Sequence, residues 1–232
     1  MRIIAVGDLH GRNTWKQIAS ENNYDKIILI GDYFDTHEEI SAESQQENFR
    51  ELILFKRESP DRVILLLGNH DYHYLNFVYE HYTGFQSRHH LPIQELLHEA
   101  LNENLLQVCY VHGNIAFTHA GLTKTWCTNN NIDMKKPEQQ VNDLFRQTPA
   151  AFRFTPGNNY DSTGDDITQS PIWVRPKSLY RDKIEGYVQV VGHTRQEKIS
   201  ISDGIVLIDT LGSSAEYLMV EDGEISVRSS YS

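Results

Sequence analysis

The sequence predicts an α/β fold, because short apolar segments alternate with helix-length segments along its first third. Residues 2–6, 26–30 and 62–67 are rich in Ile, Leu and Val, which is typical of buried strands. The stretches between them can each hold one helix, and right-handed crossovers of this kind leave consecutive strands parallel. Because the carboxyl ends of parallel strands lie at one edge of a sheet, the loops that follow these strands are expected to meet there.

Helices are expected between and after these strands. Residues 14–21 follow the first strand, and residues 41–58 carry apolar side chains at helical spacing until Pro60 ends the pattern. Three further helices are predicted at residues 72–82, 92–101 and 133–147.

The later strands alternate with turns. Residues 105–110 and 114–118 predict a hairpin that turns at His112-Gly113-Asn114, and residues 187–191 predict another buried strand. Residues 205–208, 215–220 and 224–227 suit an antiparallel meander. Residues 155–170 are rich in Gly, Asn, Asp, Ser and Thr, so we expect a long loop that acts as a lid or is mobile.

Composition restricts the classes of function. The chain has 232 residues and a net charge of −11, which argues against sequence-independent binding to nucleic acid or to an anionic membrane. No apolar stretch approaches the length of a membrane span. The two cysteines, Cys109 and Cys127, are too few for a disulfide framework, so we expect buried thiols in a cytoplasmic protein.

Five strand ends carry side chains that can bind a metal ion. The first is Gly7-Asp8-Leu9-His10-Gly11, in which a carboxylate and an imidazole lie one residue apart. The others carry Asp32 with Asp35, Asn69 with His70, His119, and His193. A single histidine at a strand end is more often structural, and Gly with Asp is common in ordinary turns. Five such ends that converge favour a metal site.

These strand-end motifs, GDLHG, GDYFD, GNHD, THAG and GHT, occur in the order found in calcineurin-like metallophosphoesterases. The spacing resembles the phosphoprotein-phosphatase branch, with bacterial and phage relatives that include the symmetrical diadenosine tetraphosphatases. The resemblance extends from residue 2 to about residue 220. It implies one domain over residues 1–232, with two mixed sheets in a four-layer α/β/β/α sandwich.

The resemblance also implies two divalent metal ions. Asp8 and His10 would hold the first ion, and Asp32 would bridge both. The second ion would be held by Asn69, His119 and His193. Oxygen and nitrogen ligands without thiolate suit manganese, which we expect, and also iron or zinc.

By the same resemblance, His70 would protonate the leaving oxygen of the substrate. Asp35 would hydrogen-bond the His70 imidazole and fix its tautomer. Among the remaining histidines, His73 follows the GNHD loop closely enough to line the pocket.

One expected phosphate-binding arginine is missing. The family usually has Arg-Gly after the second motif, where this chain has Thr36-His37. Arg175, in a Trp-x-Arg segment of the kind found in bacterial members, is the first candidate to bind phosphate. Three side chains remain open as replacements for the missing arginine: Arg12, His37 and Arg195.

The expected activity is hydrolysis of phosphate monoesters, as in Ser/Thr protein phosphatases, by a hydroxide that the two ions share. Many phosphodiesterases of the superfamily have a second histidine where this chain has Arg195, which favours the monoesterase branch. The alternative is hydrolysis of a nucleotide anhydride, such as a diadenosine polyphosphate, or of a nucleic-acid end phosphate. A third reading is a metal-dead regulatory module that binds a partner. In the two enzyme readings, the expected partner is a phosphorylated substrate, either a phosphoprotein or a nucleotide.

Overall fold

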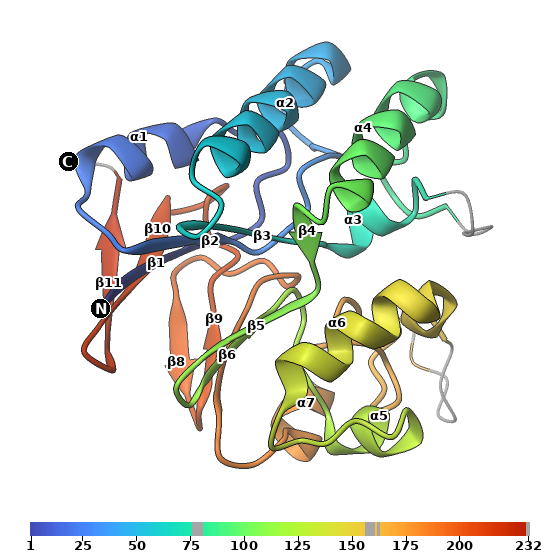
Figure 1. Cartoon of the computed structure of the whole chain (residues 1–232), viewed down its shortest axis with the longest axis vertical. Helices are drawn as coiled ribbons and strands as arrows, with labels where there is room; N and C mark the ends of the chain where they lie inside the picture. Colours follow the sequence, from blue (N-terminus) through green and yellow to red (C-terminus); the bar gives the residue numbers. More distant parts are fainter. Residues whose placement is uncertain (76–80, 156–160, 162, 231–232) are drawn as a thin grey trace.

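Two β-sheets face each other and helices cover their outer faces, in a computed structural model that describes residues 1–75, 81–155, 161 and 163–230 (Figure 1). Alternate side chains of the first strand point to opposite faces of its sheet and so belong to two different cores. Ile3 and Ala5 pack toward Phe117 of the opposite sheet, whereas Ile4 and Val6 belong to the core beneath the helices. The expected architecture of two mixed sheets with flanking helices is confirmed.

The first sheet has the order β11-β10-β1-β2-β3-β4. Its strands β1, β2 and β3 are parallel, as the alternation of strands and helices predicted. The strand β4 also pairs in parallel with β3. The bounds are β1 Arg2–Val6, β2 Lys26–Leu29, β3 Val63–Leu66, β4 Leu106–Gln107, β10 Glu216–Glu221 and β11 Glu224–Ser229. The strands β10 and β11 form an antiparallel hairpin beside β1.

The second sheet has the order β5-β6-β7-β9-β8. Its central strands β6, β7 and β9 are parallel, and the edge strands β5 and β8 run antiparallel to their neighbours. The bounds are β5 Cys109–His112, β6 Ile115–Thr118, β7 Val188–Val191, β8 Ser200–Ser202 and β9 Ile205–Leu207.

The helices α1, α2 and α4 lie on the first sheet, and α5, α6 and α7 lie beside the second (Figure 1). The α-helices span Thr14–Glu21, Ala42–Glu58, Asn69–Tyr72, His90–Asn102, Lys124–Asn129, Pro137–Gln147 and Pro176–Asp182, in order from α1 to α7. Short 3-10 helices span Ser87–His89 and Pro149–Phe152. Within the part of the chain that the structure describes, none of the helices has the length and apolar composition that a membrane span requires. Cys109 and Cys127 are free and buried, as expected.

The helix predicted at residues 72–82 is wrong. The helix α3 ends at Tyr72, and residues 81–85 form no helix, while residues 76–80 lie outside the described part. His73 and Tyr74 instead direct their side chains to Asp35, and the backbone N–H of Tyr82 donates to His73 Nδ1 at 3.2 Å. These polar contacts hold residues 73–74 and Tyr82 near Asp35, and they replace the helix that the sequence predicted.

The strand predicted at residues 105–110 is divided between the two sheets. Its first part is β4 and its second part is β5, whose hairpin with β6 turns as predicted. Asn142 supports the crossing, because its side-chain oxygen accepts the N–H groups of Val108 and Cys109 at 2.9 and 3.1 Å. The helix predicted from residue 133 begins at Pro137, a residue that suits the first turn of a helix.

The predicted C-terminal meander is also wrong. The strand β9 lies between β7 and β8 in the second sheet, and only β10 and β11 form the expected hairpin. The chain returns to the first sheet through a turn at Thr210, whose carbonyl accepts three backbone N–H groups from residues 213–215. The strand β8 and the short helices α5 and α7 were not predicted. Of the loop predicted at residues 155–170, the described residues contain no helix or strand, and residues 156–160 and 162 lie outside the described part.

Candidate metal centre

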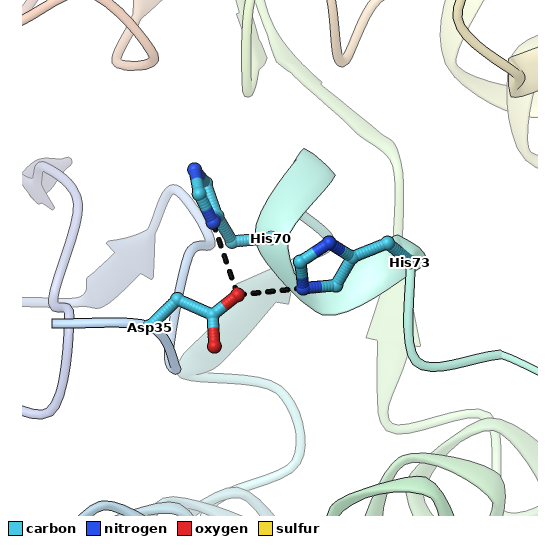
Figure 2. A group of neighbouring side chains, drawn as sticks. All are labelled: Asp35, His70 and His73. Atoms are coloured by element: carbon cyan, nitrogen blue, oxygen red, sulfur yellow. Dashed lines mark hydrogen bonds and ion pairs between the residues drawn. The ribbon is translucent and has the colours of Figure 1, made fainter. Parts of the chain in front are cut away.

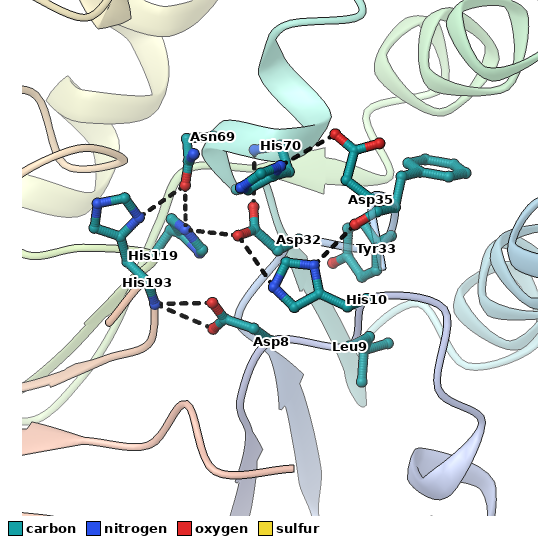
Figure 3. A network of polar contacts seen from close by, with 12 residues as sticks. Asp8, Leu9, His10, Asp32, Tyr33, Asp35, Asn69, His70, His119 and His193 are labelled. Carbon is teal, nitrogen blue, oxygen red and sulfur yellow. Dashed lines mark hydrogen bonds and ion pairs between the residues drawn. The ribbon is translucent and has the colours of Figure 1, made fainter. Parts of the chain in front are cut away.

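Five loops from the two sheets meet at one site (Figure 3). Asp8 follows β1, Asp32 follows β2 and Asn69 begins α3 after β3, all in the first sheet. His119 follows β6 and His193 follows β7 in the second sheet. Since these strands are parallel within each sheet, their carboxyl ends bring the loops to a common edge, as the sequence predicted.

The loop backbones are held in conformations that non-glycine residues rarely adopt. His10, Asp32 and His193 have φ values of 45°, 52° and 63°. The N–H of His10 donates to the carbonyl of Asp32 at 2.6 Å, and the N–H of His193 donates to Asp8 Oδ2 at 2.9 Å. Strained backbone of this kind persists where the surrounding structure fixes it, and it is concentrated at functional sites.

Three histidines of the cluster have defined tautomers. Each has one ring nitrogen within 2.9–3.1 Å of a backbone carbonyl: His10 with Phe34, His119 with Ile30, and His193 with Trp173. A carbonyl can only accept a hydrogen bond, so this ring nitrogen carries the hydrogen. Burial lowers the pKa of all three histidines, that of His193 well below its usual range. The second ring nitrogen of each neutral imidazole therefore carries a lone pair.

These lone pairs converge on oxygen atoms that also carry lone pairs. His119 Nε2 and His193 Nδ1 lie 2.9 and 2.8 Å from Asn69 Oδ1. His119 Nε2 and His10 Nε2 lie 3.4 and 3.8 Å from Asp32 Oδ2. Atoms that cannot donate hydrogen bonds to one another are complementary to a cation, and imidazole with carboxylate and amide oxygens is a typical ligand set for one.

Buried carboxylates strengthen this conclusion. Ligand atoms of Asp8, Asp32 and His119 all lie within 4.8 Å of one another. Burial and the charges of Asp209 and Asp32 raise the pKa of Asp8 well above its usual range. Burial and the charge of Asp32 raise the pKa of Asp209 to about 6. A bound cation would compensate these charges, so the residues present fit divalent metal ions.

His70 and Asp35 lie beside this cluster (Figure 3). His70 Nδ1 is 3.1 Å from Asp35 Oδ2. Burial alone would lower the pKa of His70, but the charges of Asp32 and Asp35 outweigh it and raise the pKa to about 9. Burial would raise the pKa of Asp35, but the hydrogen bonds from His70 and His73 lower it to about 2. The pair therefore consists of a protonated imidazole and a carboxylate, and a cation bound at Asp32 would lower the His70 pKa by repulsion.

The sequence suggested that His73 lines the pocket. Its side chain is instead buried behind Asp35 (Figure 2). Its Nε2 lies 2.6 Å from Asp35 Oδ2, the same oxygen that contacts His70.

The arginine candidates lie in two different places. Arg175 donates to the carbonyl of His193 at 3.0 Å, and with Asn69 and His70 it lines a pocket of about 540 Å³. Arg12 is held by Glu38 at 2.6 Å and lies near the Gly212 turn, where Arg195 donates to the Gly212 carbonyl at 3.2 Å.

His37, the third side chain left open to replace the missing arginine, is exposed. Of the candidates, only Arg175 shares a pocket with His70.

Two further carboxylates, Asp71 and Asp209, belong to the site and are not among the predicted residues. Asp71 is the last residue of the GNHD motif. Its carboxylate accepts backbone N–H groups from both the Asp32 loop and the Gly68 loop. Asp209 is buried beside Asp8 and follows the strand β9. Its signal was its position in the Ile208-Asp209-Thr210 segment after an apolar strand, the same arrangement that marked the five motifs.

A family profile for calcineurin-like phosphoesterases matches residues 1–196 of the chain. Two curated relatives are symmetrical bis(5'-nucleosyl)-tetraphosphatases, from Aromatoleum aromaticum and Nitrosospira multiformis. They are 27% and 29% identical to this chain in alignments of 137 positions that cover 54% of the chain. The matched region spans about half of each relative, 46% of its length.

Solved structures share the fold at lower identity. A cold-active protein-tyrosine phosphatase from a Shewanella species aligns with a TM-score of 0.64 and 18% identity, over 99% of this chain and 78% of that one. A protein serine/threonine phosphatase from Saccharomyces cerevisiae aligns with a TM-score of 0.60 and 11% identity, over 98% and 79%. The profile match covers every loop of the metal centre up to His193. The chain therefore belongs to the calcineurin-like phosphoesterases, the metal-dependent phosphoesterases that its strand-end motifs resemble.

Proposed function

We propose that the chain hydrolyses the phosphoric anhydride bond of a dinucleoside polyphosphate, with diadenosine tetraphosphate as the substrate to test. The convergence of unprotonated His119 and His193 nitrogens on Asn69 Oδ1 carries the proposal of metal-dependent hydrolysis. The choice of substrate rests on the curated relatives, which are named as symmetrical tetraphosphatases. They favour the anhydride alternative over the monoester hydrolysis that the sequence first suggested.

Six side chains are proposed as metal ligands. Asp8 and His10 would bind one ion, Asp32 both ions, and Asn69, His119 and His193 the other. Two divalent cations, for which we propose manganese, would polarise the phosphoryl oxygens and lower the pKa of a bound water. Asn69 contributes a neutral oxygen, which limits the negative charge that an approaching polyphosphate meets.

His70 would act as the general acid. Its Nδ1 faces Asp35, so Nε2 is the nitrogen that can face the substrate. As the oxygen of a water that has lost a proton to solvent forms a bond to phosphorus, the bond from phosphorus to the leaving phosphate oxygen breaks. That oxygen takes the Nε2 proton of His70. Arg175 would bind the phosphate oxygens from the wall of the same pocket.

The test uses protein that is stripped with a chelator and reloaded with manganese. It is given diadenosine tetraphosphate, p-nitrophenyl phosphate, its bis-ester and a phosphoseryl peptide. We expect the tetraphosphate to yield two molecules of ADP. Asp32→Asn and His70→Ala should each lower kcat by about 100-fold or more, since a general acid alone contributes about 10²–10⁴-fold. Asp143→Asn, at a partly exposed carboxylate on α6, is the matched control and should retain activity.

Each other outcome has a defined meaning. Turnover of the phosphoseryl peptide or p-nitrophenyl phosphate without the tetraphosphate would replace the anhydride proposal with monoester hydrolysis. Turnover of the bis-ester alone would contradict both. A reloaded protein that binds no metal would contradict the metal-dependent mechanism.

A further inference from the structure

We infer that His73 is a positioning residue for His70, because its Nε2 lies 2.6 Å from the same Asp35 oxygen that contacts the His70 imidazole. The inference rests on the proposed function, in which His70 protonates the leaving group. His73 lies one turn beyond His70 in the chain, and its side chain reaches Asp35 from the opposite side (Figure 2). The arrangement is a row of three groups, His70, Asp35 and His73, that share one carboxylate oxygen.

The tautomer of His73 follows from its second contact. The backbone N–H of Tyr82 donates to His73 Nδ1 at 3.2 Å, so this nitrogen carries the lone pair. Nε2 of the neutral ring then carries the hydrogen and faces Asp35 Oδ2 at 2.6 Å. This assignment also argues against a metal ion between these three side chains, because a ligand nitrogen needs its lone pair free.

Aromatic rings enclose the His73 imidazole. The Tyr82 ring is stacked on it at an interplanar angle of 4°, and the rings of Tyr74 and Phe85 meet it edge-on at 4.6 and 5.0 Å between centroids. The side chain of His73 is 0% exposed. In surroundings without water, a hydrogen bond to a carboxylate is stronger. Burial also disfavours a positive charge on the His73 ring.

The other oxygen of Asp35 is also occupied. Tyr74 donates its hydroxyl to Oδ1, and Gln86 Nε2 donates to the same atom at 3.1 Å. Each donor withdraws negative charge from the carboxylate and fixes its plane. His70 is thereby held in one orientation.

The kinetic test compares substrates whose leaving groups need protonation to different degrees. Phenyl phosphate has a more basic leaving oxygen than p-nitrophenyl phosphate, so it depends more on the general acid. We expect His73→Leu to lower kcat for phenyl phosphate about 10-fold more than for p-nitrophenyl phosphate. His73→Gln, which places an amide N–H near the position of Nε2, should restore most of this difference. An equal loss on both substrates would overturn the inference.

Two controls separate positioning from folding. His98→Leu makes the same replacement at a partly buried histidine of α4 and should leave the ratio of the two rates unchanged. In a His70→Ala background, His73→Leu should no longer change the ratio, since residues that act as a unit are not additive. A further change of ratio in that background would show that His73 does not act through His70.

Long-range ¹H–¹⁵N spectra of the histidine rings test the contact without activity. We expect His73 to carry its hydrogen on Nε2 in the metal-loaded protein, and a hydrogen on Nδ1 would overturn the inference. If the wild-type protein does not hydrolyse the tetraphosphate, the proposed function fails. If it hydrolyses the tetraphosphate but neither aryl phosphate, the spectra alone test the inference. The spectra still decide whether His73 donates to Asp35.

Discussion

Asp71 connects the loops that carry Asp32 and Asn69. It accepts the backbone N–H groups of Asp32, Tyr33 and Gly68 at 2.8–2.9 Å, and its side chain is fully buried. Burial and the charge of Asp32 outweigh these three hydrogen bonds and raise its pKa to about 8. Asp71 therefore fixes the position of the proposed bridging ligand without a predicted role in metal binding.

Replacing Asp71 by Ala should lower the free energy of unfolding by at least about 2–3 kcal/mol, because buried N–H groups lose their acceptor. Asp71→Asn should lower the free energy of unfolding less than Asp71→Ala, since one acceptor oxygen remains. It should still lower this free energy, because the new amide N–H₂ group faces backbone N–H donors. Urea unfolding measures both. Asp143→Ala, which breaks an exposed ion pair with Arg146, should cost less than about 1 kcal/mol. Equal effects of Asp71→Ala and Asp143→Ala would contradict this account.

The arginines can also be distinguished by substitution. Arg175→Ala should lower kcat/KM for the phosphate substrate by about 100-fold, because a fixed guanidinium stabilises phosphoryl charge in the transition state. Arg195 is exposed and bonded to the Gly212 turn, so Arg195→Ala should change kcat/KM by less than about 3-fold. Steady-state kinetics with both variants decides between them. A larger loss of kcat/KM for Arg195→Ala than for Arg175→Ala would indicate that phosphate is bound beside the Gly212 turn.

At the level of elements, two strand ends need glycine because the proposed ligands lie against the backbone. A Cβ atom on Gly192 would overlap the Asp8 carboxylate, and one on Gly68 would overlap the Asp32 carboxylate. Neither position has a positive φ, so the requirement is close approach and not backbone conformation.

Gly192→Ala should therefore displace Asp8 and weaken metal binding by about 10–100-fold, as changes in the groups that orient ligands do. Gly212→Ala is the matched control, because the nearest atoms to its Cβ belong to the flexible end of the Arg12 side chain. Calorimetric titration of the stripped protein with manganese measures both variants. Unchanged affinity in Gly192→Ala would show that Asp8 does not bind the ion from its observed position.

The sequence predicted elements best where apolar periodicity was strong. The bounds of α1 and β1 agree with prediction, and α2 differs only by Ser41, which caps the helix by accepting the Ser44 N–H at 3.1 Å. Prediction failed where polar side chains decide the path. His73 and Tyr74 turn toward Asp35, and Asn142 holds the crossing between sheets. These contacts join residues that are distant in the sequence, so local propensity could not indicate them.

For the whole molecule, the candidate metal centre connects the two sheets. Asp8, Asp32 and Asn69 come from the first sheet, and His119 and His193 come from the second. Cations that neutralise the buried carboxylates stabilise the folded state more than the unfolded chain.

Chelation should therefore lower the thermal unfolding midpoint. At a metal concentration 100 times Kd, binding contributes about 2.7 kcal/mol, which corresponds to about 5–10 °C for a domain of this size. Differential scanning calorimetry with chelator, and then with added manganese, should show the loss and its recovery. Asp32→Asn should respond less to both additions. A midpoint that chelator does not change would argue that the two sheets close without metal.

The sequence by itself determined the α/β class and five strand ends with side chains that can bind a metal ion, because strand periodicity and Gly-Asp or Gly-His motifs are local. It also indicated His70, Asp35 and Arg175, through a resemblance carried by those motifs. Only the tertiary structure decided that β9 joins the second sheet, that Asp71 ties two loops together, and that His73 shares the Asp35 carboxylate. The physical reason is that these features depend on contacts between distant segments: a hydrogen bond acts only when folding brings donor and acceptor within about 3 Å.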